Sequence, residues 1–271
     1  MRNVCFAIVL AAAGAAISSA SPALGQAAPI SEWVQVGQDI DSESDGDRAG
    51  GAVAISADGN TIIVGAINNE DNGRNSGHAR VFRLNDSTWT QIGQDINGDP
   101  GDNSGGAVAI SADGNTVIIG AVSNEDNGRD SGVARVFRLN DSTWTQIGQD
   151  INGEVEDGFG RQVAISADGN TIVISASGPV GDGAQHARVF RLNDSTWTQI
   201  GQDINGDLVE FRGDAVAISG DGNTIITGDN RTHVNGTDSG VARVFRLEDN
   251  TWGQLGKIFT EKPSSITSER Q

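Results

Sequence analysis

The octapeptide VAISADGN occupies residues 53–60, recurs unchanged at residues 108–115 and 163–170, and recurs as VAISGDGN at residues 216–223. Its copies start 55, 55 and 53 residues apart, and such a fixed spacing indicates an architecture of repeated units. In each copy an Asp-Gly pair separates two apolar runs, and glycine accepts the positive φ of a tight hairpin turn. The stretch therefore predicts one β-hairpin per repeat.

Each repeat contains four short runs of β type. In the first repeat, GAVAIS is followed by TIIVGA at residues 61–66, ARVFRL at residues 79–84 and TWTQIGQDI at residues 88–96. None of these runs has the sustained apolar period of a helix. A four-stranded antiparallel sheet cannot bury both of its faces alone, so neighbouring copies must stack. We therefore expect an all-β chain whose sheets are the blades of a β-propeller.

The repeats define the expected domain organisation. The propeller should cover residues 32–258, beginning with a lone copy of the outer strand at residues 32–40 and followed by a polar tail at residues 259–271. We expect four blades, at residues 50–96, 105–151, 160–204 and 213–258. The lone strand is surplus, since the last repeat has its own outer strand at Trp252. Either a four-bladed ring closes with an extra edge strand, or the ring is open and a second copy of the chain completes it as a homo-oligomer.

Residues 1–25 have the layout of a signal peptide. Arg2 precedes an apolar run from Val4 to about Ile17, and small residues and a proline follow. The run is too short for a confident membrane span, so we expect no membrane insertion. Cys5, the only cysteine, lies in this segment, and the mature protein would therefore have no disulfide. We expect a secreted, extracellular protein, or a periplasmic one if the source is bacterial.

The composition limits the partners. The chain has 36 acidic and 18 basic residues, and this balance disfavours nucleic acid while it leaves calcium and basic partners open. Nearly half of the basic residues are the paired arginines of the ARVFRL runs, whose regular copies predict a structural role in pairing with acids of adjoining strands. The tryptophans recur at one strand position, which predicts packing between blades.

Residues 158–179, GFGRQVAISADGNTIVISASGP, resemble the FG-GAP repeat of integrin-type β-propellers. Phe159 and Gly160 match the FG pair, and residues 176–179 stand near the GAP. The resemblance extends more loosely over about residues 32–258, and it implies the propeller fold. In that family the calcium-bearing repeats carry a carboxylate-rich loop between the two inner strands. Here that place holds only SADGNT, with a single carboxylate per copy, so calcium is not expected there.

A second acidic loop follows each tryptophan strand and offers oxygen ligands at alternate positions. Six to eight such ligands suit calcium, so if the protein binds calcium, we expect the ion in these loops. Asp and Asn also favour turns by bonding their own backbone, which is the alternative. The candidate metal ligands are Asp41, Asp95, Asn97, Asp99, Asp102, Asp150, Asn152, Asp157, Asp203, Asn205 and Asp207.

The loops after each second strand vary between copies, and scaffolds carry binding in such loops. The candidate ligand-binding residues there are Asn69, Glu70, Asp71, Asn124, Glu125 and Asp126. We predict no catalytic residue: His78 and His186 occupy a slot that holds valine in the other copies. The expected function is a non-enzymatic binding or adhesion module for protein or glycan. An extracellular carbohydrate-active enzyme that uses loop carboxylates and a structural matrix or coat protein are the alternatives.

Overall fold

The computed structural model describes residues 33–178, 186–205, 215–229 and 240–256. The chain divides into two compact units, Met1–Gln35 and Val36–Gln271. In the first unit, the described residues 33–35 form neither helix nor strand. The predicted signal peptide and the polar tail lie outside the described residues. In the described parts of the chain, no helix has the length and apolar character needed to cross a membrane.

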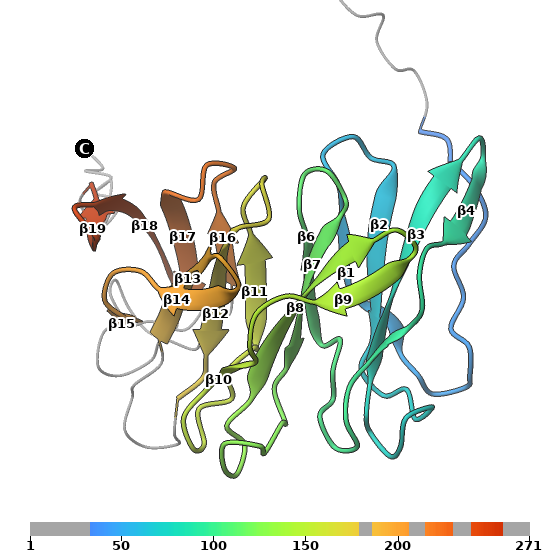
Figure 1. Ribbon diagram of the computed structural model, residues 1–271, viewed down its shortest axis with the longest axis horizontal. Helices are drawn as coiled ribbons and strands as arrows, with labels where there is room; N and C mark the ends of the chain where they lie inside the picture. Colours follow the sequence, from blue (N-terminus) through green and yellow to red (C-terminus); the bar gives the residue numbers. More distant parts are fainter. Residues whose placement is uncertain (1–32, 179–185, 206–214, 230–239, 257–271) are drawn as a thin grey trace, which may run out of the picture. The chain divides into compact units, whose positions relative to one another are not determined.

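The second unit consists of four antiparallel sheets, one for each repeat (Figure 1). The strands of the first two sheets are β1 (Ala49–Ile55), β2 (Thr61–Ala66), β3 (His78–Asn85), β4 (Thr88–Gln91), β5 (Ile96–Asn97), β6 (Ala107–Ile110), β7 (Thr116–Ala121), β8 (Val133–Asn140), β9 (Thr143–Gln146) and β10 (Ile151–Asn152). The strands of the last two sheets are β11 (Gln162–Ile165), β12 (Thr171–Ala176), β13 (His186–Asn193), β14 (Thr196–Gln199), β15 (Ile204–Asn205), β16 (Ala215–Ile218), β17 (Thr224–Asp229), β18 (Val241–Glu248) and β19 (Thr251–Leu255).

Each sheet is a meander of four strands in chain order, and its first strand contacts the first strand of the next sheet. The sheets are thus β-propeller blades, as the repeat predicts. We number these blades 1 to 4 along the chain. In blades 1 to 3 the third strand also pairs with a two-residue fifth strand, β5, β10 or β15, which the sequence pattern does not predict.

The hairpin turn of the repeated octapeptide is built as expected. In blade 1, Ser56 Oγ donates to Asp58 Oδ1 at 2.6 Å, and the backbone N–H of Asn60 donates to the same oxygen at 3.0 Å. Gly59 takes a φ of 74°, in the left-handed region that favours glycine. The same bonds recur in the other three copies, so this turn serves to form each blade.

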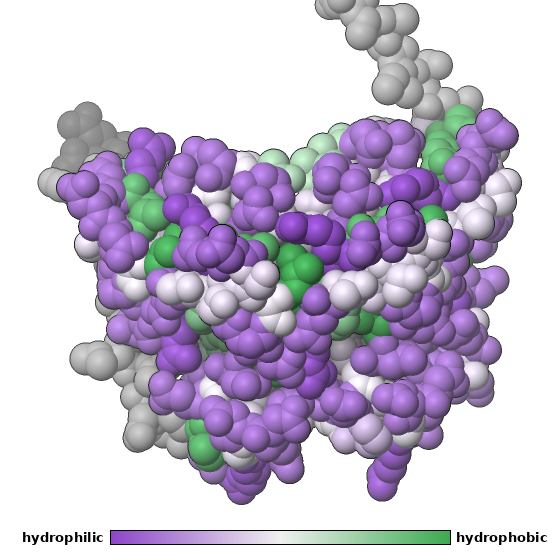
Figure 2. Space-filling view, viewed as in Figure 1, coloured by the Kyte–Doolittle hydropathy of each residue, from purple (hydrophilic) through white to green (hydrophobic). Residues whose placement is uncertain are grey.

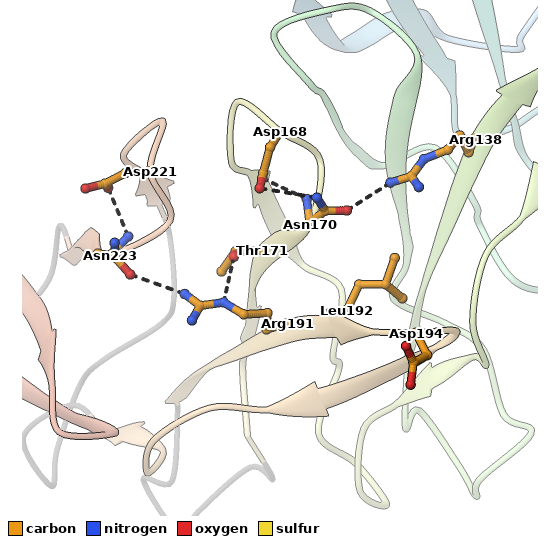
Figure 3. A pocket seen from close by; sticks show the side chains of 9 residues that line it. All are labelled: Arg138, Asp168, Asn170, Thr171, Arg191, Leu192, Asp194, Asp221 and Asn223. Atoms are coloured by element: carbon orange, nitrogen blue, oxygen red, sulfur yellow. Dashed lines mark hydrogen bonds between the residues drawn. The ribbon is translucent and has the colours of Figure 1, made fainter.

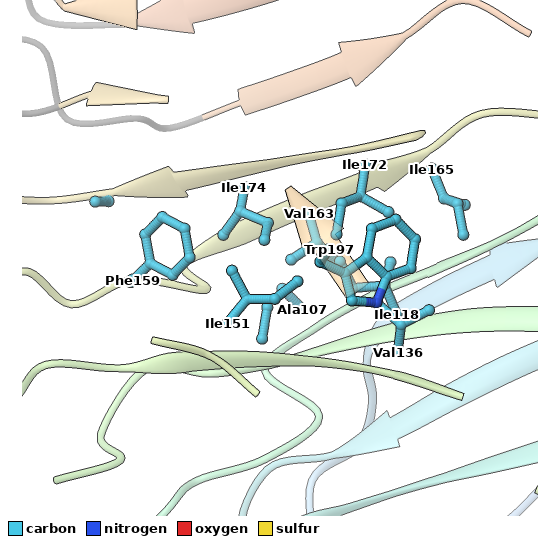
Figure 4. Packing of buried hydrophobic residues seen from close by; sticks show 12 residues of the cluster. Ala107, Ile118, Val136, Ile151, Phe159, Val163, Ile165, Ile172, Ile174 and Trp197 are labelled. Atoms are coloured by element: carbon cyan, nitrogen blue, oxygen red, sulfur yellow. The ribbon is translucent and has the colours of Figure 1, made fainter. Parts of the chain in front are cut away.

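The hydrophobic core lies between neighbouring blades. Figure 4 shows the junction of blades 2 and 3, where Ile118 and Val136 meet Ile172 and Trp197. Phe159, the aromatic residue of the FG pair, is fully buried in this cluster. Corresponding clusters fill the other two junctions, so each inner blade uses both faces to stack on its neighbours. The face of the molecule in Figure 2 is largely hydrophilic, with hydrophobic residues in scattered patches.

Each of these junctions is fastened by a contact that we call the tryptophan clasp. At Trp197 the indole N–H donates to the carbonyl oxygen of Ile147 at 2.9 Å. The Gln149 side chain accepts from the backbone N–H of Trp197 at 3.0 Å and donates to its carbonyl oxygen at 2.8 Å. A Cβ on Gly148 would lie 2.5 Å from the indole, so only glycine leaves room for the ring. The same clasps form at Trp144 and Trp252, which confirms the predicted role in packing between blades.

The lone strand predicted at residues 32–40 is wrong, because the described residues 33–40 form no strand. Residues 36–38 supply a clasp instead. The indole N–H of Trp89 donates to the carbonyl oxygen of Val36 at 2.9 Å, and Gln38 bonds the Trp89 backbone. The segment has the residues of an outer strand that form the clasp, but among the described residues no other strand of its own blade lies beside it. It therefore has no neighbouring strand with which to form a sheet.

Candidate functional site

The turns and the long loops of the blades form two separate sets of sites. On the turn side, a pocket of about 420 Å³ lies across blade 3 and is also lined by Arg138 of blade 2 and by Asp221 and Asn223 of blade 4 (Figure 3). In it, Arg191 donates to Thr171 at 3.2 Å and to Asn223 at 3.2 Å. The same pair of bonds is made by Arg83 and by Arg138 at the other junctions. This regular arginine ladder joins the blades, so we assign it to the scaffold.

The turn carboxylates do not fit calcium. Both carboxylate oxygens of Asp58 accept hydrogen bonds, from Ser56 and from Asn60. These bonds hold the pKa of Asp58 below its ordinary value. At Asp113 burial acts in the opposite direction, but the equivalent bonds outweigh it, and the pKa of its carboxyl is lowered too. Each turn carboxylate is committed to hydrogen bonds within its own turn.

On the loop side, blade 1 has a pocket of about 480 Å³ that is lined by polar and acidic side chains. The residues that line it are Ser44, Asp45, Gly46, Asp47, Asn68, Glu70, Asp71 and Asn75. Asp47 is buried and accepts from the backbone N–H of Ser44 at 2.9 Å, whereas Asp45, Glu70 and Asp71 are exposed. Four carboxylates without a basic side chain in the lining suit a positively charged ligand.

The predicted ligand-binding residues split into two groups. Asn69 and Asn124 are buried and brace the loops: Asn124 donates to Asp102 at 2.9 Å and to Asp126 at 3.0 Å. Asn69 makes the same contacts in blade 1. The acidic residues, Glu70, Asp71, Glu125 and Asp126, are exposed.

The predicted metal ligands do not form one set per loop. Asp95 accepts from Gln91 in its own blade, whereas Asp99 and Asp102 contact Arg135 of the next blade. Asp41 accepts from Arg80 through its backbone oxygen. The placement of the remaining candidates also varies: Asp150 and Asp203 bond arginines, Asp157 is buried, Asn97, Asn152 and Asn205 are exposed, and Asp207 lies outside the described residues.

Arg135 occupies the centre of the acidic cluster in blade 2. Its guanidinium donates to Asp102 at 2.7 Å and to Asp150 at 3.0 Å, and it lies 3.4 Å from both Asp99 and Asp126. Burial opposes its charge, but hydrogen bonds with Asp102 and Asp150 raise the pKa of Arg135 above its ordinary value. The arginine provides the positive charge that these acids need, which confirms the structural role predicted for ARVFRL. Calcium in these loops stays a prediction.

Two histidine sites were missed by sequence reasoning, which treated the histidines as replacements for valine. His186 lies with Nε2 at 3.6 Å from the buried Asp157 carboxylate. Burial raises the pKa of Asp157, although the neighbouring His186 acts in the opposite direction. In blade 1, His78, Glu43 and Asp95 present ligand atoms within 4.8 Å of one another. The available signal was that a polar residue replaces valine at a position whose neighbours are acids.

The family comparison supports the repeat. Residues 41–82 match the profile described as FG-GAP repeat. The chain carries an FG-GAP repeat. This FG-GAP repeat covers the acidic pocket of blade 1 and the strands beneath it, and its central octapeptide returns unchanged in blades 2 and 3 and with one substitution, Gly220, in blade 4. No curated protein matches the chain in sequence.

Several solved structures are similar to the chain. Kuenenia stuttgartiensis hydrazine synthase matches with 15% identity over 73% of this chain and 50% of that one, at a TM-score of 0.45. A hypothetical selenium-binding protein from Sulfolobus tokodaii has 10% identity, with coverage of 74% and 52% and a TM-score of 0.48. The Dos1 propeller has 12% identity, with coverage of 75% and 43% and a TM-score of 0.47. The chain thus spans about half the length of these proteins.

Proposed function

We propose that the protein is a secreted, non-enzymatic binding module that holds a positively charged segment of a partner protein on its loop side. The acidic pocket of blade 1 carries the proposal, because Asp45, Asp47, Glu70 and Asp71 line it together. The net charge of −18 would also steer a basic partner toward the protein. The signal-like N-terminus supports secretion.

The carboxyl pKa values favour binding over catalysis. Catalytic acids need a raised pKa at a site that a substrate reaches. Among the described carboxyls with a shifted pKa, the raised one is that of Asp157, which is buried away from the acidic pocket. A carbohydrate-active enzyme is therefore the weaker alternative, and no contact among the described residues favours a matrix or coat role.

The test pairs two variants that each remove two exposed carboxylates. Asp45→Asn with Glu70→Gln changes the acidic pocket, whereas Asp86→Asn with Asp141→Asn changes exposed turn residues that keep their positive φ as asparagine. The mature protein is first screened on arrays of lysine- and arginine-rich peptides and of glycans, and the best peptide is then titrated by fluorescence anisotropy. We expect the pocket variant to raise Kd about tenfold, or about 1.4 kcal/mol, and the turn variant to change it little.

Equal effects of the two variants would reduce the result to net charge and contradict a pocket. Binding to glycans alone would contradict a basic protein partner. Hydrolysis of an arrayed glycan would contradict the non-enzymatic assignment.

A further inference from the structure

His78 is a buried imidazole without a hydrogen bond. It begins β3, its exposed fraction is 1%, and neither Nδ1 nor Nε2 has a hydrogen-bond partner in the described structure. Burying a polar group unpaired is unfavourable, and buried polar atoms are normally bonded. Blades 2 and 4 place Val133 and Val241 at the same position, so packing alone does not require a histidine here.

Two carboxylates lie beside this imidazole. Glu43 Oε2 is 3.8 Å from His78 Nδ1, too far for a hydrogen bond, and Asp95 completes a group whose ligand atoms all lie within 4.8 Å of one another. The second oxygen of Glu43, Oε1, lies 3.4 Å from Arg80, which orients the carboxylate. Oδ1 of Asp95 is held by Gln91 at 2.7 Å.

Comparison with the other blades shows why Asp95 is available. Its counterparts Asp150 and Asp203 accept from Arg135 at 3.0 Å and from Arg188 at 3.2 Å. In blade 1, Arg80 instead donates to the backbone oxygen of Asp41 at 2.6 Å, and the described contacts include none from Arg80 to Asp95. Blade 1 therefore differs from blades 2 and 3, because its arginine bonds Asp41 and leaves Asp95 beside His78 and Glu43.

We propose that Glu43, His78 and Asp95 bind one divalent transition-metal ion, for which zinc is the probe. Ligands at about 2.0–2.2 Å from zinc and at tetrahedral corners lie about 3.4 Å apart, so modest side-chain movement brings these atoms into range. An imidazole with two carboxylates suits zinc and its neighbours rather than calcium, which takes oxygen ligands. Glu43 is exposed, and water from that side takes the fourth position.

The experiment uses valine, the residue that the repeat itself places at this position. The mature protein, stripped by a chelator, is titrated with zinc by calorimetry and with cobalt by visible absorption, whose intensity reports tetrahedral geometry. His78→Val should weaken zinc binding at least about 100-fold and remove the cobalt band, because outer contacts alone contribute 10–100-fold. His186→Val is the matched control and should keep both.

Zinc affinity that is equal in the wild type and in His78→Val would overturn the proposal and assign the metal to surface carboxylates. Absence of zinc binding by the folded wild type would overturn it as well. In that case, NMR resonances of the His78 imidazole that show both ring nitrogens protonated would identify an ion pair with Glu43 in place of the metal.

A second and independent observation concerns the two end blades, each of which has one uncovered apolar face. On blade 1, Val53 and Ile55 are 65% and 60% exposed, whereas Val163 and Ile165 at the same positions of blade 3 are 8% and 9% exposed. On blade 4 the opposite face is uncovered: Ile226 is 40% exposed. Its counterparts Ile63, Ile118 and Val173 are fully buried.

The clasp of the last blade is also open. A Cβ on Gly256 would meet no atom within 4 Å, whereas at Gly93, Gly148 and Gly201 it would meet the indole of the following blade. Gly256 has the same backbone conformation, with a φ of 78°. Leu255 beside it is 40% exposed.

The two uncovered faces are of the same two types that pack against each other at every junction within the chain. Blade 4 ends in the type of face that blade 3 presents to blade 4, and blade 1 begins with the type that blade 2 presents to blade 1. We infer that these apolar faces join two copies of the chain head to tail by packing like that between consecutive blades, while Trp89 of the receiving copy keeps its own clasp with residues 36–38. Such an interface is heterologous, so one chain uses its first blade and the other its last.

The test is a complementation in solution. Ile55→Lys and Ile226→Lys each place a charge on one exposed face. Because both side chains are exposed, we expect both variants to fold, and circular dichroism checks this. By analytical ultracentrifugation, the wild type should be a dimer or larger and each variant should shift toward monomer. An equimolar mixture of the variants should form 1:1 dimers, because each variant keeps the face that the other lacks.

A monomeric wild type at high concentration would overturn the inference and favour closure within one chain. A mixture that stays monomeric while the wild type dimerises would overturn the head-to-tail arrangement.

Discussion

Trp197→Ala should lower the free energy of unfolding by about 3–5 kcal/mol, the usual cost of removing a large buried aromatic side chain. The indole is 3% exposed and packs in the core between blades 2 and 3. The variant also loses the hydrogen bond from the indole N–H to Ile147, and the carbonyl oxygen of Ile147 is left without this partner. Urea denaturation followed by circular dichroism measures the change.

The matched control is Trp33→Ala. Trp33 occupies the same place in the repeated outer-strand motif, but it is 96% exposed, so its removal should change stability by less than about 0.5 kcal/mol. Equal losses for both variants would contradict the view that the clasp, rather than tryptophan content, stabilises the blades. A loss below about 1 kcal/mol at Trp197 would contradict its role at the junction.

Gly120→Ala should destabilise the protein by at least about 2 kcal/mol, because the added methyl group meets backbone that cannot move aside. A Cβ at this position would lie 2.0 Å from the carbonyl oxygen of Gly160 in the loop that begins blade 3. Gly65 has the same close approach, to Gly105. Glycine in a strand often marks such a contact.

Gly228→Ala is the control for this prediction, since it changes the equivalent residue of blade 4. There the nearest atom to an added Cβ is the side chain of Ala215 at 3.5 Å, which is ordinary contact. We expect this variant to be neutral or slightly stabilising. Thermal unfolding of both variants by circular dichroism makes the comparison, and similar melting temperatures would show that the loop at Gly160 relaxes without cost.

Local chemistry explains how much of the fold the sequence predicts. Asp58, Gly59 and Asn60 make a hairpin turn from bonds within five residues, so their pattern was sufficient. The tryptophan position likewise predicted burial between blades. The two-residue strands β5, β10 and β15 were missed because such short pairing has no periodicity to detect.

The candidate site was less predictable because it joins distant residues. Arg135 contacts Asp102 from 33 positions earlier and Asp150 from 15 positions later, and the sequence does not show that both reach one guanidinium. Nor does it show that Arg80 departs from this arrangement and bonds the backbone of Asp41. Glu70 and Asp71 are exposed, as charged loop residues normally are, and their role in ligand binding stays a prediction.

The tryptophan clasp has a consequence for how the chain acquires its structure. Every clasp pairs a glutamine with a tryptophan that comes about 50 positions later, as Gln94 does with Trp144 and Gln202 with Trp252. The receiving half therefore always leaves the ribosome first. A newly made blade finds its docking surface already formed, and no contact of this kind waits for a segment from the far end of the chain. Assembly can proceed in one direction, one repeat at a time, and the loop closed at each step keeps the same modest length.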